Sequence, residues 1–159
     1  MSNPADRRND VRLITVLRPH VWGLNFRLAE FENSDGLAMV HPSVLMSLEL
    51  VREQLNYEFG GGVRIVITDA VRTPAENEAL AARLGWIDEG GAVSRTSKHL
   101  AEYGGIAVDL RAHRSDNGIS TPISQRDLGR VCRLHFDWVK DDYADGHVHA
   151  DNRLGGLRK

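Results

Sequence analysis

Strand patterns and helix patterns alternate along this chain, and their order sets the class of fold. Short, β-branched stretches at Arg64–Thr68 and Gly105–Arg111 are typical of buried strands. Apolar residues recur at helical spacing over 42–59, before the first stretch. A T-x-x-E capping box with proline at the first helical position predicts a helix over 73–84, between the two strands.

The C-terminal third of the chain continues this pattern. Ser124, with Asp127 three residues later, predicts the start of a helix that reaches about Arg133. Two strands, 136–140 and 147–152, then follow on either side of an Asp-Gly turn signal. The complete order favours an α+β domain with a small, largely antiparallel sheet and flanking helices.

The length of 159 residues suits one compact domain. Residues 1–25 are expected to form an N-terminal arm that contains one short strand pattern, VRLITVL, at 11–17. Residues 26–159 are expected to form the single domain. Its one cysteine, Cys132, excludes an internal disulfide framework and lies in an apolar stretch typical of a buried thiol.

Charge and hydropathy exclude several classes of partner. Twenty basic and 22 acidic residues give a net charge of -2, which argues against a nucleic-acid binder. The polar N-terminus lacks the apolar core of a signal peptide. No apolar run approaches the ~20 residues that span a bilayer, so no membrane association is expected. Synthesis in the cytoplasm is expected, and work outside the cell would need another export route.

Two histidines and an acid alternate near the C-terminus, in the stretch DGHVHAD. Side chains on a strand alternate between faces, so His147, His149 and Asp151 would point the same way, ~6.6 Å apart. Two imidazoles at that separation can share a metal site. An H-x-H pattern alone is also typical of an exposed polar strand face.

A second stretch, 96–112, supplies another histidine and another acid. His99 is expected in a loop, and Asp109 on a strand whose same face carries the small residues Ala107 and Gly105. Small neighbours leave room beside the acid. Two histidines and an aspartate form a sound three-ligand set for Zn²⁺ with a fourth position for water. Structural zinc more often uses cysteines, which this chain does not supply.

These motifs together resemble those of the zinc D-alanyl-D-alanine carboxypeptidase family. Its relatives include vancomycin-resistance dipeptidases and phage L-alanyl-D-glutamate endopeptidases. The chain has S-K-H at 97–99, G-I-A-V-D at 105–109 and H-V-H-A-D at 147–151, in the order that the family shows. The likeness extends upstream through ITDAVRTPAEN at 67–77 and covers about residues 26–151.

One spacing departs from that pattern. Nine residues lie between His99 and Asp109, where the family usually has six. The additional residues fall in a glycine-bearing stretch, HLAEYGG, and a loop absorbs three residues at little thermodynamic cost. The longer loop could also shift His99 or the adjoining pocket wall.

The resemblance implies a Hedgehog/DD-peptidase fold with one zinc ion. The implied ligands are His99, Asp109 and His149. Ser97 and Asp151 are expected to support the ligands or the local structure, and which of the two orients a metal-bound histidine stays open.

The resemblance also implies catalytic roles for residues near the metal. His147 is expected to transfer protons near the metal, because an imidazole pKa near ~6.5 suits that task. Asp145 is the alternative general base, although its spacing from the last ligand differs from that of the family. Arg72 is expected to bind a substrate carboxylate or the developing oxyanion through its planar fork. The alternative for Arg72 is a surface ion pair at the entry of a helix.

The activity implied by the resemblance is hydrolysis of peptide bonds in the stem or cross-link peptides of peptidoglycan. The bond would be that of a D-Ala-D-Ala carboxypeptidase or of an L-Ala-D-Glu endopeptidase. A chain of this length without an export signal suits a phage endolysin or a virion-associated lysin. One alternative is a peptidase or amidase that acts on another peptide. Another is a non-catalytic, zinc-stabilised structural or cell-wall-binding module. The sequence leaves the oligomeric state and the host open.

Overall fold

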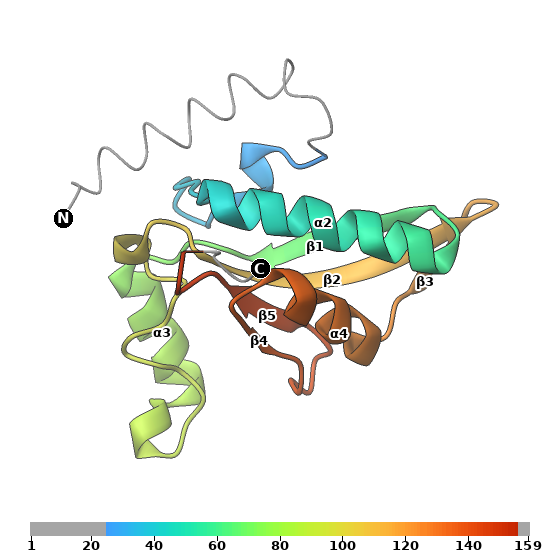
Figure 1. Ribbon diagram of the computed structural model, residues 1–159. Coiled ribbons are helices and arrows are strands. Elements are labelled where there is room, and N and C mark those ends of the chain that lie inside the picture. The colour runs from blue at the N-terminus through green and yellow to red at the C-terminus, as the bar shows by residue number, and fades with distance from the viewer. Residues whose placement is uncertain (1–24, 156–159) are drawn as a thin grey trace.

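The computed structural model describes residues 25–155, so almost all of the expected N-terminal arm, with the strand pattern at 11–17, lies outside the described residues. Within residues 25–155, three α-helices and a five-stranded antiparallel sheet confirm the expected α+β class (Figure 1). The α-helices are α2 (Pro42–Phe59), α3 (Pro74–Leu84) and α4 (Gln125–His135). The strands are β1 (Val63–Asp69), β2 (Ala107–Asp116), β3 (Ile119–Pro122), β4 (Trp138–Lys140) and β5 (Val148–Asp151). Short 3-10 helices are η2 (Leu28–Phe31), η3 (Ile87–Glu89) and η4 (Ala101–Tyr103).

The sheet is built around β2. Its strand order is β1-β2-β5-β4, and β3 pairs with the distal half of β2. The first half of β2 pairs with β5, so Asp109 lies directly opposite His149. Between Ile67 and Asp69 the β1–β2 register shifts, and this irregularity lies beside Asp109. An irregular register of this kind changes the direction in which nearby side chains point.

Strand β3 was missed in the sequence-based prediction. A two-residue turn at Asn117 and Gly118, with φ of 49° and 82°, connects it to β2. Positive φ at both positions is the type I′ geometry that an Asn-Gly pair favours. All four β3 residues are exposed, so no alternating burial pattern marked the strand. Pairing with β1 and β3 also extends β2 to Asp116, beyond the expected end at Arg111.

Helices α2 and α4 pack on one face of the sheet. They contribute buried residues such as Leu48 and Val131 to the core, where they join Leu110 and Val148 of the sheet. His41 accepts a hydrogen bond from the backbone N–H of Ser43 at the start of α2, and Gly60 ends the helix with φ of 75°. The predicted bounds of this helix are confirmed.

The opposite face of the sheet carries polar side chains. Alternation along β1 leaves Arg64, Val66 and Thr68 exposed on that face. Helix α3 does not cover this face but extends from the end of β1, away from α2 and α4 (Figure 1). The loop after α3 returns to the sheet, where Arg72 N–H donates to the His99 carbonyl at 2.7 Å. This return places a distant loop beside β1 and β2.

The C-terminal hairpin is shorter than expected on both sides. Strand β4 begins at Trp138 and not at residue 136, and β5 spans Val148–Asp151 and not 147–152. Just before β4, the Asp137 N–H donates to the Asp151 carbonyl and to the Asn152 side chain. Among the described residues, no helix is both long enough and apolar enough to cross a bilayer.

Candidate metal centre

Three side chains from separate parts of the chain converge on the polar face of the sheet. His99 comes from the loop after α3, Asp109 from β2 and His149 from β5. The His99 Nε2 atom lies 3.0 Å from Asp109 Oδ1 and 3.0 Å from His149 Nδ1, and the last two atoms are 2.9 Å apart. Ligand atoms about 2.0–2.1 Å from a tetrahedral zinc ion lie roughly 3.3 Å from each other. This nearly equilateral triangle therefore fits a metal ion.

The outer nitrogens of both histidines are held by hydrogen bonds. His99 Nδ1 donates to the Ala70 carbonyl at 2.5 Å, and His149 Nε2 donates to Asp151 Oδ2 at 3.0 Å. A carbonyl can only accept, so His99 carries its proton on Nδ1 and presents an Nε2 lone pair. The equivalent bond to the Asp151 carboxylate leaves a lone pair on His149 Nδ1. Such outer partners fix the tautomer and orientation of metal-binding imidazoles.

Asp151, rather than Ser97, is hydrogen-bonded to a ring nitrogen of one of the candidate ligands, His149. The carboxylate of Asp151 is fully buried and also accepts hydrogen bonds from Arg153 Nε and Nη2 at 2.8 and 2.7 Å. Ser97 instead accepts a long hydrogen bond, 3.4 Å, from the backbone N–H of His99. Ser97 therefore shapes the loop, and its side chain makes no hydrogen bond to either imidazole.

The charges of the cluster reinforce one another. Burial disfavours the ionised form of Asp109, but the neighbouring His99 and His149 outweigh burial and hold its pKa well below the ordinary value. Burial opposes protonation of His149, whereas hydrogen bonds to Asp109 and Asp151 raise its pKa. Burial is likewise outweighed at Asp151, where Arg153 and His149 lower the pKa to about 2. The cluster thus presents two carboxylates that stay ionised near neutral pH.

His147 and Asp145 form a hydrogen-bonded pair at the edge of this cluster. The His147 Nδ1 atom lies 2.5 Å from Asp145 Oδ1, and its Nε2 atom lies 3.6 Å from Asp109 Oδ2. Tyr143 stacks on the imidazole with ring centroids 4.0 Å apart. Arg111 Nη2 donates to the Asp145 carbonyl at 2.6 Å and so anchors the loop. His147 and Asp145, which the sequence offered as alternative general bases, are therefore hydrogen-bonded to each other.

Arg72 lies at the entry of α3, and its backbone N–H donates to the carbonyl of His99. Its guanidinium bonds to the Asp69 carboxylate and, at 3.0 Å, to Asn77 Oδ1, and only 12% of its side chain is exposed. The ion pair at the helix entry, which was the alternative for Arg72, is therefore present, with 12% of the arginine side chain and 36% of the Asp69 side chain exposed. A guanidinium has five N–H donors, and these two bonds leave others for a ligand.

Tyr143 is a residue of this site that sequence reasoning missed. Burial and the charges of Asp109 and Asp142 raise its pKa to about 12, while the positive charge of Arg72 acts in the opposite direction. Its phenol therefore keeps its proton at neutral pH. One indication of this role was present in the sequence, because Tyr143 lies four residues before His147. No motif includes Tyr143.

The long spacing between His99 and Asp109 is absorbed by a compact turn. Helix η4 and the following glycines, with φ of 76° at Gly104 and Gly105, return the chain to β2. A side chain at Gly105 would place its Cβ 2.8 Å from the Val40 Cα atom. The turn is thus packed tightly against the segment before α2, and His99 still reaches the cluster.

Cys132 takes no part in the site. It lies on the buried face of α4, and burial raises the pKa of its thiol well above the ordinary value. A buried, protonated thiol is a poor nucleophile.

The arrangement could hold one divalent metal ion on two imidazoles and a carboxylate, with the hydrogen-bonded pair of His147 and Asp145 beside it. No protein-family model matches the chain, and a search of curated proteins gives no match either.

Proposed function

We propose that this chain is a zinc-dependent peptidase that hydrolyses peptide bonds in the stem or cross-link peptides of peptidoglycan. One observation carries the proposal. Three lone-pair-bearing atoms, from His99, Asp109 and His149, converge within 3.0 Å of one another, while the outer nitrogen of each histidine is tied down. Such atoms repel one another unless a proton or a metal ion lies between them, and a triangle of three atoms suits a metal ion.

Zinc is the metal that suits this donor set best. Two imidazoles and one carboxylate with a free fourth position are typical of catalytic zinc, whereas structural zinc sites more often use cysteines. When bound, zinc would supply an activated water and polarise the scissile carbonyl. The side chains around the ligands would bind the substrate and transfer protons.

His147 is placed to hold and move the proton. Because Nδ1 donates to Asp145, the lone pair of Nε2 faces the ligand cluster, 3.6 Å from Asp109 Oδ2. The Asp145 carboxylate accepts the hydrogen bond from Nδ1 and so orients the ring. We therefore assign proton transfer to His147 Nε2 and the orienting role to Asp145.

Arg72 and Tyr143 are placed to bind the polar groups of the substrate. Arg72 has free N–H donors close to the cluster, and a guanidinium suits a carboxylate or a developing oxyanion. The protonated phenol of Tyr143 can donate a hydrogen bond. Both side chains act by binding and orientation.

The peptidoglycan substrate is supported by the motifs S-K-H, G-I-A-V-D and H-V-H-A-D and by their order. The same resemblance supports a phage endolysin or virion-associated lysin, with the D-Ala-D-Ala or the L-Ala-D-Glu bond as its target. The rival functions are a peptidase for other peptides and a zinc-stabilised module that binds cell wall without cutting it.

One experiment separates these functions. Purified full-length protein is added to peptidoglycan, new amino groups are followed with and without a chelator, and the fragments are identified by mass spectrometry. Release that stops with chelator and returns with zinc is the expected result. Tight binding to the wall without release would support the module, and cleavage of unrelated peptides alone would support the other peptidase.

Removing the imidazole of His147 should separate catalysis from metal binding. His147→Ala is expected to lower turnover about 10²- to 10⁴-fold, the usual contribution of a general acid–base. Zinc affinity should change little, because His147 is not one of the three converging ligands. His113→Ala, a substitution on the same sheet face, serves as the control. Full turnover by His147→Ala would refute the assigned role.

A further inference from the structure

Strand β1 lies at an edge of the sheet, because β2 is its only strand partner within residues 25–155. Along an edge strand, the backbone groups of successive residues point alternately towards the neighbouring strand and away from it. The Ser115 N–H donates to the Gly62 carbonyl at 2.9 Å, so every second residue after Gly62 bonds to β2 in the same way. Val66 is one of these residues. The N–H and C=O groups of Ile67 therefore face outward, away from β2.

A side chain at the start of β1 confirms this alternation. Asn56 accepts a hydrogen bond from the Val63 N–H at 2.9 Å and donates to the Val63 carbonyl at 3.3 Å, so both backbone groups of Val63 face away from β2. Ile67 lies four residues further along the strand and has the same orientation. In the described part of the chain, no group caps the outward N–H and C=O of Ile67 in the way that Asn56 caps those of Val63. Unpaired edge groups of this kind can bind another strand.

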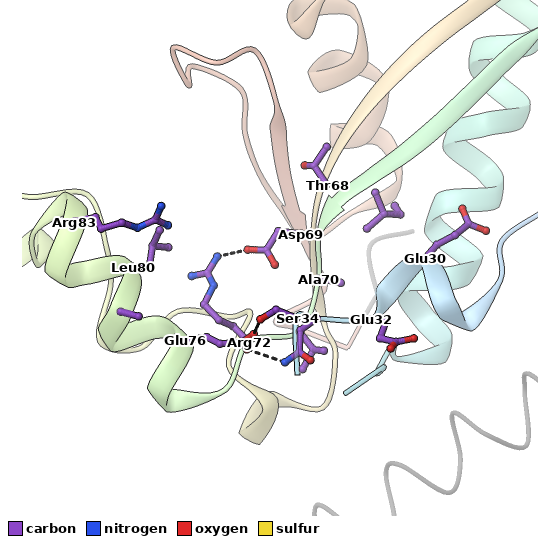
Figure 2. Close-up of a pocket in the computed structure, with 14 residues that line it drawn as sticks. Glu30, Glu32, Ser34, Thr68, Asp69, Ala70, Arg72, Glu76, Leu80 and Arg83 are labelled. Carbon is purple, nitrogen blue, oxygen red and sulfur yellow. Dashed lines mark hydrogen bonds and ion pairs between the residues drawn. The ribbon is translucent and has the colours of Figure 1, made fainter. Parts of the chain in front are cut away.

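Ile67 also lines a pocket of about 520 Å³. The pocket follows the end of β1, with helix η2 and the turn after it on one side and helix α3 on the other (Figure 2). Ala79 and Leu80 contribute apolar surface from α3. The volume lies within the range of about 300–1,000 Å³ that is usual for ligand sites. The edge of β1 at Ile67 therefore borders a hollow that can hold part of a peptide.

The pocket leads towards the metal centre. Asp69 lines the pocket and lies directly opposite the candidate ligand Asp109 in the register of β1 and β2. Ala70 lines it as well, and its carbonyl accepts the hydrogen bond from His99 Nδ1. A peptide paired with β1 would lie two strand spacings, about 10 Å, from β2, and about three extended residues span that distance.

We propose that the edge of β1 at Ile67 binds the main chain of an extended peptide substrate by strand addition. In an antiparallel pair, the Ile67 N–H donates to the carbonyl of one peptide residue, and the Ile67 carbonyl accepts from the N–H of the same residue. The inference rests on the proposed function and deepens it, because it makes the substrate a peptide that extends at least about three residues from the scissile bond. A free dipeptide is too short to reach this edge.

The first test measures binding without cleavage. Zinc-loaded full-length protein is titrated with N-acetyl tetra-L-alanine dimethylamide, which offers backbone groups and only methyl side chains, and amide hydrogen exchange is followed by NMR. Exchange at Ile67 should slow as the peptide is added, whereas exchange at Val139, in the edge strand β4 across the sheet, should not change. The same peptide with every N–H methylated has no donor for the Ile67 carbonyl. It should bind about two- to tenfold more weakly, which corresponds to the loss of one hydrogen bond.

A pair of variants tests Ile67 in the reaction itself. Ile67→Pro removes an N–H that makes no bond to β2, whereas Ile67→Val keeps the N–H and shortens the side chain. With a peptidoglycan stem pentapeptide as substrate, Ile67→Pro should raise KM about two- to tenfold above that of Ile67→Val and leave kcat unchanged. Circular dichroism melts show whether the proline variant is folded. If it is not folded, the methylated peptide still decides the question.

The proposal would be overturned by exchange at Ile67 that does not respond to the peptide, by equal binding of the methylated peptide, or by equal KM values of the two folded variants. Slow exchange at Ile67 without any peptide would also overturn it, because another part of the chain would then occupy the edge, or a second copy if the protection rises with protein concentration. Pairing with tetra-L-alanine by a protein that cuts no peptidoglycan would retain the binding edge and refute the proposed activity. Peptidoglycan hydrolysis without protection of Ile67 would do the reverse.

Discussion

The hydrogen-bond partners of the two candidate histidine ligands determine which ring nitrogen can bind a metal ion. His99 and His149 each have one nitrogen committed to an acceptor, the Ala70 carbonyl or the Asp151 carboxylate. The other nitrogen of each ring faces Asp109 and is left to bind a proton or a metal ion. A histidine on an exposed strand face has no such constraint.

The carboxylate of Asp151 should tune the affinity of the centre. In Asp151→Asn the neutral amide oxygen still accepts from His149 but no longer polarises it, so zinc affinity is expected to fall about 10- to 100-fold. Competition with a chromophoric chelator measures the change. Asp142→Asn, which removes a carboxylate with 76% of its side chain exposed, is the matched control. Equal affinities of the two variants would show that Asp151 has only a structural role.

Acidification should release the metal at a higher pH than an ordinary imidazole would imply. Burial lowers the pKa of His149, but hydrogen bonds to Asp109 and Asp151 outweigh burial and raise it in the metal-free protein. A raised pKa means that a proton occupies His149 at pH values where an unperturbed imidazole, with a pKa of about 6.5, is already neutral. Zinc affinity should therefore begin to fall as the pH drops towards the raised value, above about 6.5. Affinity that stays constant down to pH 6 would contradict this expectation.

Among the elements, β2 positions the centre. It holds Asp109 opposite His149 in β5 and contacts β1 at the point where the register shifts. Its entry is fixed by the turn at Gly105, where the backbone lies against Met39 and Val40. The chain must enter β2 at this position if Asp109 is to contact both imidazoles.

Substitution of Gly105 should destabilise the fold more than substitution of another positive-φ glycine. An alanine side chain at positive φ costs about 1–2 kcal/mol, and overpacking against backbone adds about 1–3 kcal/mol. Gly105→Ala meets both penalties, because its Cβ would lie 2.8 Å from Val40 Cα. Gly118→Ala has φ of 82° but nothing within 4 Å, so it meets only the first. Urea unfolding should rank the two variants, and equal losses would show that the close approach is relieved elsewhere.

At the level of the whole molecule, the core and the metal centre occupy opposite faces of the sheet. The core is a continuous apolar cluster of α2, α4 and one sheet face, and its members include Leu48, Val108, Leu110 and Phe136. It contains no disulfide and no member of the ligand set. The fold should therefore persist without the metal.

Removal of the metal should lower Tm without unfolding the protein at 25 °C. Zinc at about 1,000 times its Kd adds about 4 kcal/mol to the free energy of unfolding, which for a chain of this size raises Tm by about 10 °C. Circular dichroism melts with chelator and with added zinc measure the shift. Asp109→Ala should abolish the effect of zinc. Loss of the native spectrum at 25 °C in chelator would show that the metal is structural.

The sequence identified the elements whose signals are local. Helices over 42–59 and 73–84, and the strand that carries Asp109, could be predicted because capping residues, apolar spacing and β-branching act between near neighbours along the chain. The three candidate ligands could also be chosen, since S-K-H, G-x-A-x-D and H-x-H follow in order. The exposed strand β3 lacked any burial signal and was missed.

Tertiary contacts determined which distant side chains lie together, and no local sequence pattern indicates this. The convergence of His99, Asp109 and His149 depends on segments that meet across the fold, and so does the bond from His99 to the Ala70 carbonyl. Strand register and loop return determine which side chains meet. These depend on the free energy of packing the whole chain, which is not contained in any short stretch of it.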